Sequence, residues 1–149
     1  LFSVHRTHHK SRITRVTSGL QFSLTEKFIL TLGSVGFAAI VSWFMPITLP
    51  GLLAFFIFYY IESITGHSNI EVVPRAVVQS KWGRMFASTT FHAMHHARLN
   101  GHYGLSTTAL DYAFGTVFPD YIEAHQLVVQ GEGLLRPGQQ VNKSGGPYV

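Results

Sequence analysis

No charged side chain occurs between residues 28 and 61, and this long apolar run limits the folds that are open to the chain. Residues 28–45 would span about 27 Å as an α-helix at 1.5 Å per residue, close to the thickness of a hydrocarbon core. Pro46 and the pair Pro50-Gly51 interrupt the run, and a second apolar segment follows at 51–66. The sequence therefore predicts an all-α integral membrane protein built on a helical hairpin.

Composition and charge agree with this fold class. Hydrophobic residues make up 46% of the 149 residues and charged residues only 12%, although a buried hairpin in a soluble protein remains an alternative. All eleven Lys and Arg residues lie outside residues 28–74, and the turn at 46–50 has no charge. By the positive-inside rule, both ends of the hairpin should face the cytoplasm. Residues 5–9, 67 and 92–102 would then lie at one membrane face.

Two further segments complete the organisation of the chain. Residues 74–91 have apolar residues on one side of a helix and Lys81, Arg84 and Ser88 largely on the other, which fits a helix at the membrane interface or one packed on the domain. Residues 131–149 are rich in glycine and predict a flexible tail after a domain at 1–130. The basic residues form no continuous patch with interleaved aromatics, so a nucleic-acid partner is not expected.

Histidines recur in one pattern, H-x-x-H-H, at residues 5–9 and 92–96. On a helix this spacing places three imidazoles on one face, and neutral imidazole is the commonest metal ligand in proteins. The chain has no cysteine, so nitrogen and oxygen atoms must hold any metal. Seven or eight imidazoles are too many for one tetrahedral ion and suit two. The candidate ligands are His5, His8, His9, His67, His92, His95, His96 and His102.

Some of these residues have alternative roles. His102 could assist a ligand rather than bind metal, and His67 could cap a helix end. Glu62 is the one acidic residue in the second apolar run and is either a carboxylate that orients an imidazole or a surface residue. The histidines could also belong to a non-catalytic zinc-binding or zinc-carrying membrane protein, or to a structural protein without metal.

The histidine motifs HRTHH (5–9) and HAMHH (92–96), followed by NGHYGLSTTALDYAFGT, resemble the fatty acid hydroxylase and sterol desaturase superfamily of membrane di-iron oxygenases. GHSN at 66–69 is similar to the region where members place an additional ligand. The resemblance adds Asn69, Tyr103 and Asp111 as residues that would support the ligands. The family's first histidine motif, H-x-x-x-H, should precede His5 and is not in the chain, so a fragment lacking the ligands of that motif, and inactive alone, is one expectation.

The resemblance implies a lipid hydroxylase or desaturase that uses two iron ions, with dioxygen as co-substrate. A separate electron donor, of the cytochrome b5 or ferredoxin type, would supply the electrons. The active site would lie on the cytoplasmic face of a bacterial inner membrane or the endoplasmic reticulum. The sequence names neither the lipid nor the choice between hydroxylation and desaturation.

Overall fold

The computed structural model describes residues 2–11 and 13–132, and this part of the chain is helical and contains no β-strand. An isolated bridge between Phe86 and Thr107 is its one β-type pairing. The helical segments in chain order are α1 (Phe2–His5), η1 (His8–Lys10), η2 (Val16–Leu20), α2 (Leu24–Val41), α3 (Leu49–Gly66), α4 (Arg75–Gln79), η3 (Gly83–Met85), α5 (Thr89–Arg98), α6 (Ala109–Phe114) and α7 (Tyr121–Val129). The predicted tail lies, from residue 133, outside the described residues.

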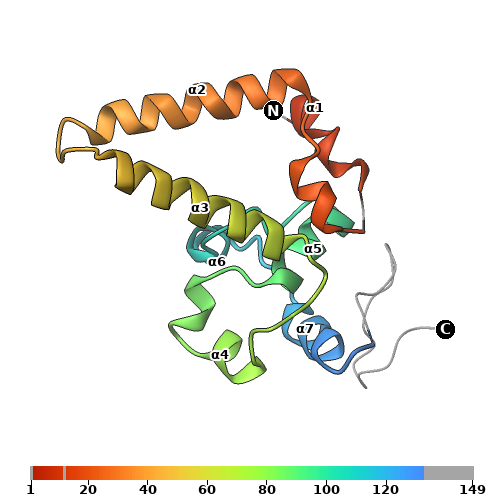
Figure 1. The fold of residues 1–149 in the computed structure, drawn as a ribbon. Helices are drawn as coiled ribbons and strands as arrows, with labels where there is room; N and C mark the ends of the chain where they lie inside the picture. Colours follow the sequence, from red (N-terminus) through yellow and green to blue (C-terminus); the bar gives the residue numbers. More distant parts are fainter. Residues whose placement is uncertain (1, 12, 133–149) are drawn as a thin grey trace.

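Helices α2 and α3 form the predicted hairpin and extend from the rest of the protein (Figure 1). Helix α2 begins four residues earlier than the apolar run at 28–45, because Ser23 caps it by accepting a hydrogen bond from the Glu26 N–H at 3.2 Å. The hydroxyl of Thr48 caps α3 in the same way, with the Gly51 N–H as donor at 3.3 Å. Pro50 lies in the first turn of α3, where its missing N–H costs no hydrogen bond.

The two helices of the hairpin are long and apolar enough to cross a membrane. Only 6% of the α2 segment and 11% of the α3 segment is buried within the protein. Large side chains such as Phe28, Phe37 and Phe58 are more than 60% exposed. A core hairpin of a soluble protein would be covered on most of its surface, so the observed exposure opposes that alternative and fits lipid-facing helices.

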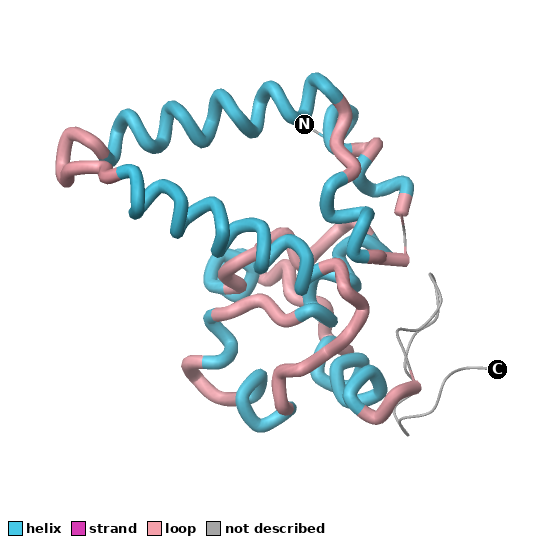
Figure 2. The backbone as a smooth tube through the Cα atoms, in the orientation of Figure 1, coloured by secondary structure: helices cyan, strands magenta, loops and turns pink. Residues whose placement is uncertain are grey.

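The compact part of the protein lies at the open end of the hairpin, where α5 packs against α7 (Figure 2). Its buried apolar cluster consists of Val78, Phe91, Met94, Tyr121 and Ala124. Helix α5 also carries the second histidine motif, and its residues from Thr89 to His96 are all buried. Packing of α5 against α7 therefore fixes the rotation of the helix that presents these histidines.

Polar contacts at both ends of α5 hold it in place. At its beginning, the Ser88 hydroxyl accepts from the Phe91 N–H at 3.2 Å, and Glu71 Oε2 accepts from the Thr90 N–H at 2.9 Å. At its end, the Arg98 guanidinium donates two hydrogen bonds of 2.6 Å to the Asp120 carboxylate, next to α7. A bidentate pair of this kind fixes orientation as well as distance.

The prediction of one amphipathic helix over residues 74–91 is wrong. The structure divides this segment into α4 and η3, which are followed by an extended stretch before α5. The Ser80 hydroxyl donates to the Val77 carbonyl at 2.7 Å and accepts from the Gly83 N–H at 2.9 Å, which turns the chain. A Cβ atom on Gly83 would lie 1.7 Å from the Val77 oxygen, so only glycine permits this close approach. The apolar residues of this segment do not share one environment either, because Val78 is buried whereas Trp82 and Phe86 are 77% and 68% exposed.

Candidate metal centre

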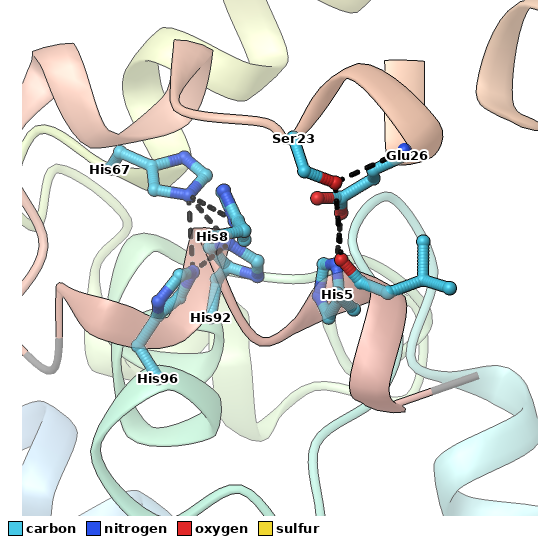
Figure 3. Close-up of polar contacts among 8 residues, drawn as sticks. His5, His8, Ser23, Glu26, His67, His92 and His96 are labelled. Atoms are coloured by element: carbon cyan, nitrogen blue, oxygen red, sulfur yellow. Dashed lines mark hydrogen bonds and ion pairs between the residues drawn. The ribbon is translucent and has the colours of Figure 1, made fainter. Parts of the chain in front are cut away.

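The histidines converge where the open end of the hairpin meets α5 (Figure 3). His67 follows α3 directly as its C-cap residue, and His92, His95 and His96 share one face of α5. The first motif is not one continuous α-helix, because α1 ends at His5 and the 3-10 helix η1 carries His8 and His9.

Four rings meet in one buried group, which we name the four-histidine group: His8, His67, His92 and His96. The Nε2 atom of His67 lies 3.2 Å from that of His8, 3.1 Å from that of His92 and 3.2 Å from that of His96. The Nε2 atoms of His92 and His96 are 3.2 Å apart. Nitrogen ligands about 2.0–2.2 Å from one ion are separated by about 2.9–3.5 Å, so these spacings fit a shared metal.

In two of these imidazoles, a hydrogen bond at Nδ1 determines which ring nitrogen carries the proton. His67 Nδ1 lies 2.7 Å from the Ser63 carbonyl oxygen, and His96 Nδ1 lies 3.1 Å from the Ser11 carbonyl oxygen. A carbonyl only accepts, so both Nδ1 atoms carry the proton and both Nε2 atoms present lone pairs. Two lone pairs at 3.2 Å repel each other unless a cation lies between them.

Protons are poor candidates for that cation. Burial, with the charges of neighbouring imidazoles, lowers the pKa of His8 to about 4 and that of His96 to about 2. Burial likewise lowers the pKa of His67, and it lowers the pKa of His92 well below its usual value. The rings are therefore neutral near pH 7 with lone pairs directed at a common point, which is the state that metal binding requires.

Three of the other four ligand candidates, His5, His9 and His95, form a second group that we name the three-histidine group. His95 Nδ1 donates to the Gly101 carbonyl at 2.8 Å, which leaves its Nε2 atom free to bind a metal. His5 Nδ1 contacts the carboxylate of Glu26, which is only 4% exposed in the first turn of α2. A carboxylate behind a metal-binding imidazole fixes the orientation of its ring and raises its basicity.

The two groups adjoin each other. The ring centroids of His9 and His96, one from each group, are 4.5 Å apart, and those of His5 and His8 are 5.0 Å apart. Seven of the eight predicted ligands therefore meet in two neighbouring sets, one of four and one of three. The structure brings together residues that are separated by up to about ninety positions in the sequence, as the hairpin topology predicted.

His102 lies outside both groups. Its Nδ1 atom donates to the Phe91 carbonyl at 3.0 Å, and its Nε2 atom accepts from the Phe118 N–H at 2.9 Å. The ring is fully buried and is stacked on Phe91 at 3.8 Å between centroids. With both nitrogens occupied by backbone partners, His102 has the environment of a packing residue and not that of a ligand.

The four predicted supporting residues lie in different surroundings. Glu62 accepts from the Ser106 hydroxyl at 2.5 Å and is in contact with no imidazole in the described residues, while Asn69 is exposed with φ at +60°. The Tyr103 ring lies 5.6 Å from that of His95. Asp111 is buried and accepts from the backbone N–H groups of Tyr103 and Gly104, both at 2.8 Å. It thus shapes the loop whose Gly101 carbonyl orients His95.

Sequence reasoning missed two residues at the site. Glu26 was not among the candidates, although an acid at the beginning of a membrane helix, near a histidine motif, is a signal for such a role. Gly19, in η2, leaves room for His67: a Cβ atom added there would lie 3.0 Å from His67 Nδ1 and 3.1 Å from Ser63 Oγ. No local pattern reveals this contact, since the two residues are far apart in sequence.

The fold and the paired histidine groups define a class, that of helical membrane proteins with a histidine-rich site beside the bilayer. Within this class the chain belongs to the fatty acid hydroxylase family, whose sequence model matches residues 1–116. Membership in this family implies that the protein is an oxidoreductase. No curated protein and no solved structure shows a significant match to the chain.

Proposed function

We propose that the protein is an oxygen-dependent lipid hydroxylase or desaturase whose two histidine groups each hold one iron ion. The observation that carries this proposal is the convergence of seven imidazoles into two adjoining sets, four of them with nitrogen spacings that fit one ion. Family membership and the apolar hairpin support a substrate that resides in the membrane.

The chemistry supplied by bound ferrous iron, held by neutral nitrogen ligands with open positions, is the activation of dioxygen towards unreactive C–H bonds. The residues of the chain have the task of holding the ligands in fixed orientations. The Ser63 and Ser11 carbonyls hold His67 and His96 in the tautomer that binds metal through Nε2. Glu26 performs the corresponding task for His5.

A second protein must supply electrons, because the reduction of dioxygen in such a reaction requires more electrons than the lipid provides. We propose a cytochrome b5 or a ferredoxin as this partner. All eleven Lys and Arg residues lie outside residues 28–74, which supports a cytoplasmic position of the metal centre. A cytoplasmic site would be accessible to such soluble donors.

The test begins with anaerobic loading of the detergent-purified protein with ferrous iron, followed by elemental mass spectrometry. We expect two irons per chain, and we expect His8→Ala and His95→Ala each to lower the content, since each removes one ligand from a different group. Glu62→Ala is the control, because its carboxylate binds Ser106 instead of an imidazole. The loaded protein is then supplied with oxygen, a reductant and membrane lipids, and oxidised lipid is measured by mass spectrometry.

Zinc bound in place of iron, with no oxygen-dependent lipid product, would refute the proposal in favour of a zinc-binding membrane protein. Full metal content in both histidine variants would refute the ligand assignment itself.

The orientation of the protein in the membrane is tested separately. The chain has no cysteine, so single cysteines at Trp43, in the hairpin turn, and at Gln130 can be labelled with an impermeant maleimide in intact cells. Labelling of the first position alone agrees with a cytoplasmic metal centre, and labelling of the second alone contradicts it.

A further inference from the structure

A pocket of about 580 Å³ lies between α6 and the loop that follows α5. Its volume is within the range of about 300–1,000 Å³ that is common for small-molecule sites. The apolar part of its wall comes from Tyr103, Leu105, Leu110 and Phe114. Leu110 and Phe114 are 67% and 77% exposed, so these two side chains border the open side of the pocket.

The polar residues of the wall already have partners within the protein. Asp111 accepts from the two backbone N–H groups of the loop and from Thr116 Oγ1 at 2.5 Å. Thr107 Oγ1 donates to the Met85 carbonyl at 2.8 Å, and the Ser106 hydroxyl donates to Glu62 at 2.5 Å. Because these groups are satisfied, the pocket offers apolar contact rather than hydrogen bonds, and it suits an apolar ligand.

The inner wall of the pocket adjoins both histidine groups. The Tyr103 ring lies 5.6 Å from that of His95, in the three-histidine group. A Cβ atom placed on Gly66 would lie 3.8 Å from Leu105 Cδ1 and 3.6 Å from the ring of His92, in the four-histidine group. Leu105 and His92 thus pack at the same residue, the last of α3. A ligand in the pocket would end next to the metal centre.

The outer side of the pocket is connected to the membrane hairpin. The hydrogen bond from Ser106 to Glu62 attaches the pocket loop to the last turns of α3. The pocket loop therefore lies against the end of a helix that is exposed along most of its length, so an apolar chain could pass from the lipid around α3 to the pocket with little contact with water.

We propose that this pocket holds the hydrocarbon chain of a fatty acid or fatty acyl lipid, which enters past Leu110 and Phe114 and is directed by Tyr103 and Leu105 to the histidine groups. The role of the bound chain as substrate rests on the proposed function, but the binding itself can be measured without catalysis. Tyr103 and Leu105 are positioning residues in this scheme, because they touch the chain of the substrate and do not hold the metal.

The test uses the full-length protein, loaded with zinc and inserted into phospholipid vesicles. The probe is a palmitic acid analogue that carries a diazirine at its terminal carbon. After illumination, the labelled peptides are identified by mass spectrometry. We expect label on residues 103–114 that excess unlabelled palmitic acid removes, whereas label on the lipid-exposed α2 and α3 segments is not removed. Saturable labelling distinguishes a pocket from a membrane surface.

Variants locate the binding. Leu105→Trp fills the inner end and should lower the competed label about tenfold, with metal content as the check that the histidine groups are intact. Phe114→Ala removes an exposed residue of the pocket wall and should lower the label about fivefold. Tyr112→Ala, on the same helix but outside the pocket wall, is the matched control and should leave the label unchanged.

Two results would overturn the pocket assignment: label that excess unlabelled palmitic acid does not remove, and label that stays unchanged in Phe114→Ala. If Leu105→Trp loses metal, the Phe114 variant alone decides. Failure of the proposed function gives a different pattern. Saturable labelling with no oxidised lipid from the iron-loaded protein would leave the pocket in place and reject the oxygenase.

Discussion

Glu26→Ala should weaken one metal site and leave the other intact. The Glu26 carboxylate contacts His5 Nδ1 and is 4% exposed, and within the described residues its hydrogen-bonded imidazole belongs to the three-histidine group. Removal of the carboxylate leaves the His5 ring free to rotate and lowers the basicity of its Nε2 atom. The effect should therefore be confined to the three-histidine group.

The size of the effect follows from the position of the pair. Loss of a carboxylate behind a metal-binding histidine typically costs 10–100-fold in metal affinity, or about 1.4–2.7 kcal/mol. The His5 side chain is 41% exposed, so water screens its interaction with Glu26. We therefore expect a loss near the lower limit, about tenfold in affinity at this site.

The assay is anaerobic titration of the metal-free protein with ferrous iron, in which tight and weak sites appear as separate steps. One step should shift about tenfold in Glu26→Ala and the other should not move. Glu62→Ala provides the control at a carboxylate that binds a hydroxyl. An equal shift of both steps, no shift at all, or the same shift in Glu62→Ala would refute the role of Glu26.

Three other results are expected. Gly19→Ala should weaken metal binding by the four-histidine group, because the new methyl group would lie 3.0 Å from His67 Nδ1; overpacking costs about 1–3 kcal/mol, and intact metal affinity would contradict this reading. His102→Ala should lower the unfolding free energy by about 2–4 kcal/mol but retain full metal content, and a lost iron would make His102 a ligand. The metal-free protein should lose stability as pH falls below about 6.5, because unfolded histidines take up protons there while burial keeps the pKa of His8 near 4 and that of His96 near 2. Denaturation temperatures measured from pH 7.5 to pH 4.5 test this, and an unchanged value would contradict it.

The sequence allowed the hairpin and most of the site to be predicted, because both depend on local patterns. An uncharged run of membrane length and two copies of H-x-x-H-H are visible without any knowledge of tertiary contacts. The hairpin then implied that residues 5–9, 67 and 92–96 meet at one face, and the structure has this arrangement. The orientation of the second motif was also predictable, since α5 is a regular helix.

Long-range contacts explain what could not be predicted. The segment at 74–91 has helical spacing of apolar residues, but a close approach of Gly83 to the Val77 carbonyl divides it. His102 had the same residue type and nearly the same neighbourhood as the ligands, and only its backbone partners, Phe91 and Phe118, reveal a packing role. Glu62 was considered as the acid beside an imidazole, whereas the chain path gives that contact to Glu26.

The position of the four-histidine group links the metal centre to the hairpin. Helices α2 and α3 are closest at the turn that joins them and separate towards their other ends (Figures 1 and 2). His8 stacks on Phe22, just before α2, at 4.8 Å between ring centroids. His67 directly follows α3, and the Ser63 carbonyl of the same helix orients its ring. One ion shared by His8 and His67 would therefore join the two separated ends of the hairpin. Metal binding and the spacing of the membrane helices should then be coupled, because a change in either alters the distance between the same two imidazoles.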